Sequence, residues 1–186
     1  MDLEAKQARF AREVLPHLDA AYNLARWLLR NATDAEDVAQ EACLRAYRHF
    51  DAFRGGDAKP WLLAIVRNTS FTWLAQRKRD GATEPYDEAV PGAVIDARSS
   101  FVEAPPTPED ELMRAAAREA VHRGLAALPL DYREVIVLRE LEGLSYREIA
   151  AVVDIPIGTV MSRLSRGRSL LHQALAGEQG REAQVG

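Results

Sequence analysis

The 186-residue sequence contains a single cysteine, Cys43, so an internal disulfide is impossible and a small disulfide-stapled secreted fold is excluded. Long hydrophobic runs are also missing, because the longest aliphatic stretch, Leu62 to Val66, is far shorter than the ~20 residues that span a bilayer. The N-terminus, Met1 to Glu4, is acidic and lacks the basic and apolar regions of a signal peptide. These absences predict a soluble, cytoplasmic protein without membrane insertion.

Residue patterns typical of catalysis or cofactor binding are lacking as well. The four histidines are scattered, and none lies at the spacing of a metal site or a catalytic triad. Gly55 and Gly56 are not followed by the lysine and hydroxyl residue of a phosphate-binding loop. We expect Cys43 to be a small hydrophobic residue in a helix core rather than a redox sensor. The sequence therefore predicts a non-catalytic protein with no cofactor and no metal.

Charge and proline are distributed unevenly along the chain. Residues 1–81 carry 13 Lys or Arg and 11 Asp or Glu, and residues 112–186 carry ten and nine. Residues 82–111 instead carry one arginine, eight acids and five of the nine prolines. Such a composition predicts a flexible linker that is stiffened locally by Pro105-Pro106. We therefore expect two domains, residues 1–81 and 112–177, joined by the acidic linker and followed by a polar tail, residues 178–186.

Both expected domains show the periodicity of helices, with apolar residues recurring every three or four positions. Thr33 is the expected N-cap of one helix, with Glu36 at its capping-box position, and Pro60 suits the first turn of another. The helices predicted from these signals span residues 18–29, 33–49, 60–79, 112–128 and 131–141. No β-type alternation is present. The predicted fold class is all-α, with two small helical domains.

The strongest local signal lies between residues 144 and 171. Ser145 can cap a short helix over residues 146–153, and Pro156 prevents that helix from continuing. A second, basic helix is expected to begin near residue 158. Two short helices joined by a tight turn form a helix-turn-helix, whose second helix enters the major groove of DNA. The alternative is an ordinary helical hairpin with a solvated basic face.

Several of these segments resemble a known family. Residues 144–150 (LSYREIA) and 155–164 (IPIGTVMSRL) closely resemble region 4 of extracytoplasmic-function sigma factors, group 4 of the bacterial sigma-70 family. Residues 34–42 (DAEDVAQEA) resemble its region 2.2, and residues 60–68 (PWLLAIVRN) resemble its regions 2.3 to 2.4. Two motif sets in the correct order are more specific than a lone helix-turn-helix. The resemblance implies a specificity subunit that directs core RNA polymerase to promoters and assists their opening.

A polymerase-binding surface is the first site that the resemblance implies. In the family the region 2.2 helix docks on the clamp helices of core polymerase, which implies contacts by Asp37, Gln40 and Glu41. Without the resemblance, the acids of the first turn would serve only to stabilise the N-terminus of this helix, and Gln40 and Glu41 would belong to a solvated face. A dedicated anti-sigma factor is a second partner implied by the resemblance.

A basic and aromatic stretch fits the binding of single-stranded promoter DNA. Residues 58–79 contain no acid, and they include five basic side chains with Trp61, Phe71 and Trp73. Such DNA is bound by base stacking together with cations that follow the phosphates, although we expect Trp61 to lie in the core. The −10 contacts implied by the resemblance are Phe53, Arg54, Lys59, Arg67 and Asn68. The basic end of this helix adds expected phosphate contacts at Arg77, Lys78 and Arg79. The alternative is that these three residues form a solvated helix end.

The helix-turn-helix is expected to bind the −35 element. Its outward positions Met161, Ser162, Ser165 and Arg166 are candidates for base contacts, and Arg163 for a phosphate contact. The resemblance implies DNA contacts at Arg139, Thr159, Ser162 and Arg166. Met161 and Ser165 depart from the family pattern, which leaves the preferred promoter sequence open.

Two other classes of protein fit parts of the sequence. A one-component transcriptional regulator would use residues 1–81 as a sensing or dimerisation domain, but such a domain has no need of the basic, aromatic stretch. A sigma-like adaptor would bind a partner without opening promoters, but it would not need a basic recognition helix. We therefore prefer the sigma-factor interpretation.

Overall fold

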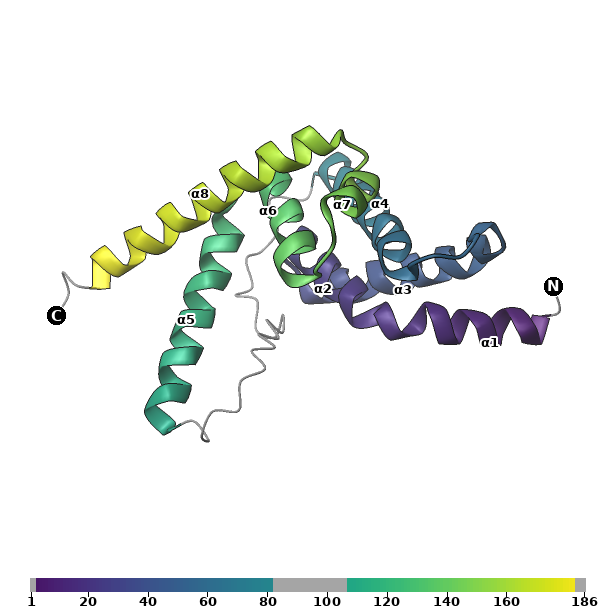
Figure 1. Ribbon diagram of the computed structural model, residues 1–186, viewed down its shortest axis with the longest axis horizontal. Coiled ribbons are helices and arrows are strands. Elements are labelled where there is room, and N and C mark those ends of the chain that lie inside the picture. The colour runs from purple at the N-terminus through teal and green to yellow at the C-terminus, as the bar shows by residue number, and fades with distance from the viewer. Residues whose placement is uncertain (1–2, 82–106, 183–186) are drawn as a thin grey trace.

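The computed structural model describes residues 3–81 and 107–182, and these residues form helices joined by short turns (Figure 1). The N-terminal half comprises α1 (Leu3–Glu13), α2 (Leu18–Leu29), α3 (Ala32–His49) and α4 (Ala58–Arg79). The C-terminal half comprises α5 (Pro108–Ala127), α6 (Leu130–Ile136), α7 (Tyr146–Val153) and α8 (Ile157–Glu182). Neither described range contains a strand, which confirms the all-α prediction, and no helix in them has the length and apolarity to cross a membrane. The expected linker lies almost wholly outside the described residues.

The N-terminal half is built on α2, α3 and α4, which pack against one another around a shared apolar core. Its largest buried side chains include Leu24, Trp27, Leu62 and Leu63. Helix α1 was not predicted, because Phe10 is its only buried residue and it therefore lacks a strong apolar stripe. The Phe10 ring meets the rings of Tyr47 and Phe50 edge to face at 5.2 Å, which fixes α1 to this half.

The start of two helices differs from the sequence prediction. Asn31, rather than Thr33, caps α3, because its extended backbone lets its side chain accept a hydrogen bond from the Asp34 amide at 2.9 Å. Asp57 caps α4 in the same way, so this helix begins at Ala58 and Pro60 lies inside its first turn. The predicted N-cap at Thr33, and with it the capping-box position of Glu36, was therefore wrong.

The helix-turn-helix of the C-terminal half confirms the strongest local prediction. Ser145 caps α7 in a capping box, in which Glu148 accepts a hydrogen bond from the Ser145 amide at 2.7 Å. Asp154 ends α7 in a left-handed conformation, and α8 begins three residues later with Val160 and Leu164 buried. Helix α8 continues to Glu182, beyond the expected domain end at residue 177.

Other elements of the C-terminal half complete its packing. The predicted helix over residues 131–141 is divided, because α6 passes into the π-helical segment η3 (Val137–Leu141). A Cβ atom added at Gly167 would lie 3.1 Å from the Ile136 side chain, so α8 approaches α6 closely at this glycine. Arg133 of α6 is buried and donates hydrogen bonds to carbonyls at the end of α5.

The two halves lie against each other. Helix α4 packs on α7, and the end of α2 packs on α6 (Figure 1). At this contact the Trp27 ring of α2 stacks on the His122 ring of α5 with centroids 5.1 Å apart. Arg133 also donates to the Trp27 carbonyl oxygen at 3.0 Å. The contact is therefore mixed in character, with an aromatic stack and buried polar interactions.

The cap of α7 gives a testable prediction. Replacing Ser145 with alanine should lower the free energy of unfolding by about 1 kcal/mol at neutral pH, because the Glu148 amide loses its acceptor. The hydrogen bonds from Ser145 also hold the pKa of Glu148 below its ordinary value of 4.5. Their stabilising contribution is therefore present above that pH and is lost as the pH falls below it. Urea unfolding of both proteins at neutral pH measures this difference, and equal free energies of unfolding would contradict the role of the cap.

Candidate nucleic-acid interface and docking groove

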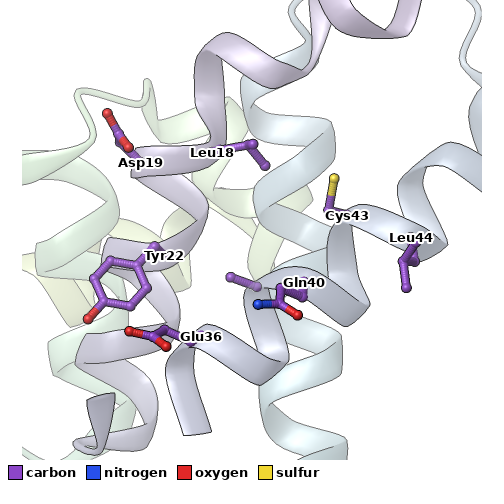
Figure 2. Close-up of a pocket in the computed structure, with 8 residues that line it drawn as sticks. Leu18, Asp19, Tyr22, Glu36, Gln40, Cys43 and Leu44 are labelled. Carbon is purple, nitrogen blue, oxygen red and sulfur yellow. The ribbon is translucent and has the colours of Figure 1, made fainter. Parts of the chain in front are cut away.

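A groove runs between α2 and α3 on the surface of the N-terminal half (Figure 2). It has a volume of about 530 Å³ and is lined by Leu18, Asp19, Tyr22, Glu36, Ala39, Gln40, Cys43 and Leu44. Figure 2 shows Tyr22 and Glu36 at one end and Cys43 and Leu44 at the other. Leu44 is 54% exposed although it is a large apolar side chain. An apolar groove with a solvent-exposed leucine and flanking acids is suited to a partner helix.

The predicted polymerase-binding residues lie at or beside this groove. Gln40 lines it, and Asp37 is exposed on the same helix. Glu41 is half-buried and receives a hydrogen bond from Arg45 at 2.6 Å. Sequence reasoning missed Leu44, which follows Gln40 by four residues and so shares its helix face. No motif marks Leu44, and its exposure beside the buried positions of α3 becomes visible only in the fold.

Cys43 is half-buried at the wall of the groove. Burial raises the pKa of its thiol, which disfavours the reactive thiolate. The expectation of a small hydrophobic residue agrees with this environment. Among the described residues no cluster of three or more His, Cys, Asp or Glu side chains could hold a metal ion.

The predicted −10 residues lie along α4 and the loop before it, and they fall into two groups. The exposed group consists of Arg54, Asn68, Lys78 and Arg79. Phe53 instead is 7% exposed, because its ring packs on Phe50 and on the half-buried Trp61. In this position Phe53 anchors the loop and has little exposed surface, and its place among the expected DNA contacts stays a prediction.

The second group consists of cations that are paired with carboxylates. The Lys59 ammonium donates to the carbonyl oxygen of Glu142 at 2.7 Å and lies 2.9 Å from its carboxylate. Arg67 donates to Glu134 at 2.8 Å, and its guanidinium lies 4.5 Å from the centre of the Phe71 ring. Arg77 pairs with Asp34 of α3. Lys59 and Arg67 therefore link α4 to acids of the C-terminal half, whereas Arg77 is paired within its own half.

Glu134 is the acid at the centre of this contact. Its side chain is only 1% exposed, and burial raises the pKa of its carboxyl, while the hydrogen bond and charge of Arg67 act in the opposite direction. Arg163 of α8 lies 3.5 Å from the same carboxylate and 3.0 Å from that of Asp131. The buried Glu134 carboxylate thus forms ion pairs with one cation of each half, Arg67 and Arg163.

The predicted −35 residues are divided in the same manner. Met161, Ser162, Ser165 and Arg166 are exposed together on one face of α8. Thr159 is half-buried, and its carbonyl oxygen accepts a hydrogen bond from the Ser162 hydroxyl at 3.0 Å. Arg163 points to the acids of α6, and Arg139 donates to the Leu144 carbonyl at 2.7 Å beside the Tyr146 ring. The outward face of α8 is therefore formed by Met161, Ser162, Ser165 and Arg166.

Comparison with known families and curated proteins identifies related proteins. Residues 14–80 match the family described as Sigma-70 region 2, and residues 118–171 match Sigma-70, region 4. The ECF RNA polymerase sigma-E factor of Escherichia coli (strain K12) is 40% identical over 139 residues, which cover 74% of this chain and 72% of the relative. The sigma-E factor of Haemophilus influenzae is 36% identical over 154 residues, which cover 82% and 79% of the two chains.

Solved structures agree with these matches. The sigma factor RpoE of Bartonella quintana, solved in complex with the anti-sigma factor NepR, aligns with a TM-score of 0.69 and 29% identity over 90% of this chain and 97% of that one. CnrH in complex with the cytosolic domain of CnrY aligns with a TM-score of 0.60 and 26% identity, over 92% and 90% of the chains. Together with the helix-turn-helix formed by α7 and α8, these similarities show that the chain belongs to the extracytoplasmic-function RNA polymerase sigma factors.

Proposed function

We propose that this sigma factor contacts promoter DNA through two surfaces, one on α8 and one on α4. The exposed face of α8 carries this proposal, because the helix-turn-helix presents Met161, Ser162, Ser165 and Arg166 together to solvent. In this proposal Arg166 binds a base edge or a phosphate in the major groove of a −35 element. Arg163 pairs with acids of α6, and Arg139 donates to the Leu144 carbonyl before α7, so in this proposal both orient the helix-turn-helix, and the half-buried Thr159 does so from the start of α8.

The α4 surface binds the melted −10 element in this proposal. Asn68 is exposed near the middle of the helix, and Arg54, Lys78 and Arg79 supply positive charge at its two ends. Lys59, Arg67 and Arg77 would extend this charge once their carboxylate partners are displaced. Cations that follow the backbone together with a polar side chain for an extruded base are the elements of single-strand recognition.

The groove between α2 and α3 is the proposed docking site for core RNA polymerase. Its apolar wall at Leu44 can bury a partner side chain, while Asp37, Gln40 and Glu41 supply polar contacts at its edge. Asp19 and Glu36 favour a partner with positive charge. Two weak DNA contacts and a polymerase contact on one chain reinforce one another through effective concentration.

The remaining assignments follow from the family. We infer that the chain is a non-catalytic specificity subunit that acts in the cytoplasm, with residues 1–81 as region 2, residues 82–111 as a linker and region 4 beginning at about residue 112. An anti-sigma factor is proposed as a regulatory partner, in keeping with the complexes in which RpoE and CnrH were solved.

Arg166 provides the test of the α8 surface. Replacing Arg166 with alanine should lower initiation from a promoter that depends on its −35 element by roughly 10- to 100-fold, the effect of losing one good contact to a base pair. Arg118, an exposed arginine of α5, offers the matched control, and Arg118→Ala should initiate as the wild type does. Both proteins are compared by run-off transcription with core polymerase. Equal activity of the two variants would contradict the assignment.

A further inference from the structure

The outward face of α8 has an apolar edge and a polar edge. Ile157, the first residue of the helix, is 43% exposed, and Met161 is 52% exposed. Residues four positions apart share one side of a helix, so these two large apolar side chains are neighbours. Ser162 and Arg166 are exposed on the other edge of the same face. An apolar pair therefore lies beside polar residues on the surface proposed to bind the −35 element.

Small residues separate the two edges. Gly158 and Ser165 lie between them on the helix surface, and both are exposed. Apart from its chain neighbours and the helix backbone, nothing lies within 4 Å of a Cβ atom added at Gly158. The space in front of the helix is thus open, and base edges can approach α8 closely enough to contact the Met161 side chain.

The arginines around the apolar edge are held by acids. Arg168, which follows Met161 by about two turns on the same side of α8, donates to Glu140 at 2.6 Å. Arg163 donates to Asp131 at 3.0 Å. Each cation is paired with a carboxylate of its own half, so neither brings an uncompensated charge to the surface around Met161. The chemistry of this edge is therefore set by its apolar side chains.

One group in the major groove of DNA matches such an edge. All four bases display hydrogen-bond donors or acceptors there, and only thymine adds an apolar group, its C5 methyl. An apolar side chain that covers a polar base edge removes it from water without replacing its hydrogen bonds, which costs free energy. Against a methyl group the same side chain buries apolar surface on both partners, and the unbranched methionine adapts its shape to the contact.

We propose that Met161 is a specificity-determining residue that contacts the methyl group of a thymine in the −35 element, with Ile157 completing the apolar contact. The proposal rests on the function proposed above for the α8 surface and names the base that this edge prefers. Residues near the N-terminus of a recognition helix contact base edges, and Met161 is the fifth residue of α8. The methyl group of that thymine therefore contributes to initiation in addition to the hydrogen-bonding pattern of the base pair.

Replacing thymine with deoxyuridine tests the proposal, because it removes the methyl group and keeps the base pair. The −35 elements that direct initiation are first selected from a randomised library with core polymerase and the full chain. Each selected thymine, on either strand, is then replaced singly by deoxyuridine, and run-off transcription compares the two templates. Met161→Ala removes the proposed contact. Met113→Ala is the matched control, because Met113 is 72% exposed but lies on α5, outside the helix-turn-helix.

The wild type and Met113→Ala are expected to initiate roughly fourfold less well from one of the deoxyuridine templates, the effect of one buried methyl group. Met161→Ala should initiate equally from the thymine and deoxyuridine templates, since the contact that senses the methyl group is gone. Arg166→Ala should initiate less well from both templates but keep the fourfold ratio, because Arg166 belongs to the polar edge.

Equal initiation by the wild type from thymine and deoxyuridine at every selected position would overturn the proposal. Selected −35 elements without thymine, or a fourfold ratio that persists in Met161→Ala, would overturn it as well. In each of these cases a loss of initiation by Arg166→Ala would leave the function proposed for α8 standing. If no −35 sequence is selected and Arg166→Ala initiates as the wild type does, both proposals fail.

Discussion

Replacing Arg133 with methionine is expected to lower the free energy of unfolding by about 3–5 kcal/mol. The buried guanidinium donates to the carbonyl oxygens of Leu125, Ala126 and Leu128 at 3.1, 3.0 and 2.8 Å, and to that of Trp27 at 3.0 Å. It thereby satisfies the last turn of α5, where carbonyls have no partner within the helix. Methionine fills a similar volume but leaves these acceptors without a donor.

Urea unfolding followed by circular dichroism measures this loss. Arg118→Met is the matched control, because Arg118 is exposed on α5 and its substitution should change stability by less than about 0.5 kcal/mol. Arg133→Lys should fall between the wild type and Arg133→Met, since an ammonium keeps the charge but not the planar fork of donors. Equal unfolding midpoints for Arg133→Met and Arg118→Met would show that these hydrogen bonds do not stabilise the fold.

Replacing Leu44 with aspartate is expected to weaken binding to core RNA polymerase by about 100-fold. Leu44 projects from α3 at the wall of the proposed docking groove, and a carboxylate there would have to lose its water in an apolar contact. The fold should be unaffected, because the side chain is already 54% exposed. Binding is measured with labelled sigma factor and purified core polymerase, and a melting curve checks the fold.

Leu3→Asp is the matched control for this prediction. Leu3 is another exposed leucine of the N-terminal half, at 63%, but it lies on α1 outside the groove. Its substitution adds the same charge and removes the same apolar group. Equal polymerase affinity for Leu44→Asp and Leu3→Asp would place the docking surface elsewhere on the protein.

Local signals predicted the C-terminal helix-turn-helix well. Ser145 has no competing cap nearby, and Pro156 stops α7, so α7 lies within the bounds that its sequence indicates. The start of α3 was predicted less well, because Asn31 and Thr33 are both good caps and only the conformation of the preceding turn decides between them. Helix α1 was not predicted from the sequence, because Phe10 is its one buried residue and a single apolar position gives no helical periodicity.

Features that depend on packing between distant segments could not be predicted. The pairing of Arg67 with Glu134 joins residues 67 positions apart, and that of Lys59 with Glu142 joins residues 83 apart. No short-range pattern specifies such partners, so both cations were interpreted only as DNA contacts. Phe53 was interpreted in the same way, although the fold buries its ring among neighbouring aromatic side chains.

Protein-dependent promoter selection is the central claim, and run-off transcription tests it most directly. Purified core RNA polymerase is incubated with a library of promoter fragments, with and without this protein, and the transcripts are sequenced. We predict specific start sites that appear only with the protein and share a −10 and a −35 element. Stable polymerase binding without specific transcripts would contradict the claim in favour of an adaptor, and specific duplex binding without polymerase binding would contradict it in favour of a transcriptional regulator.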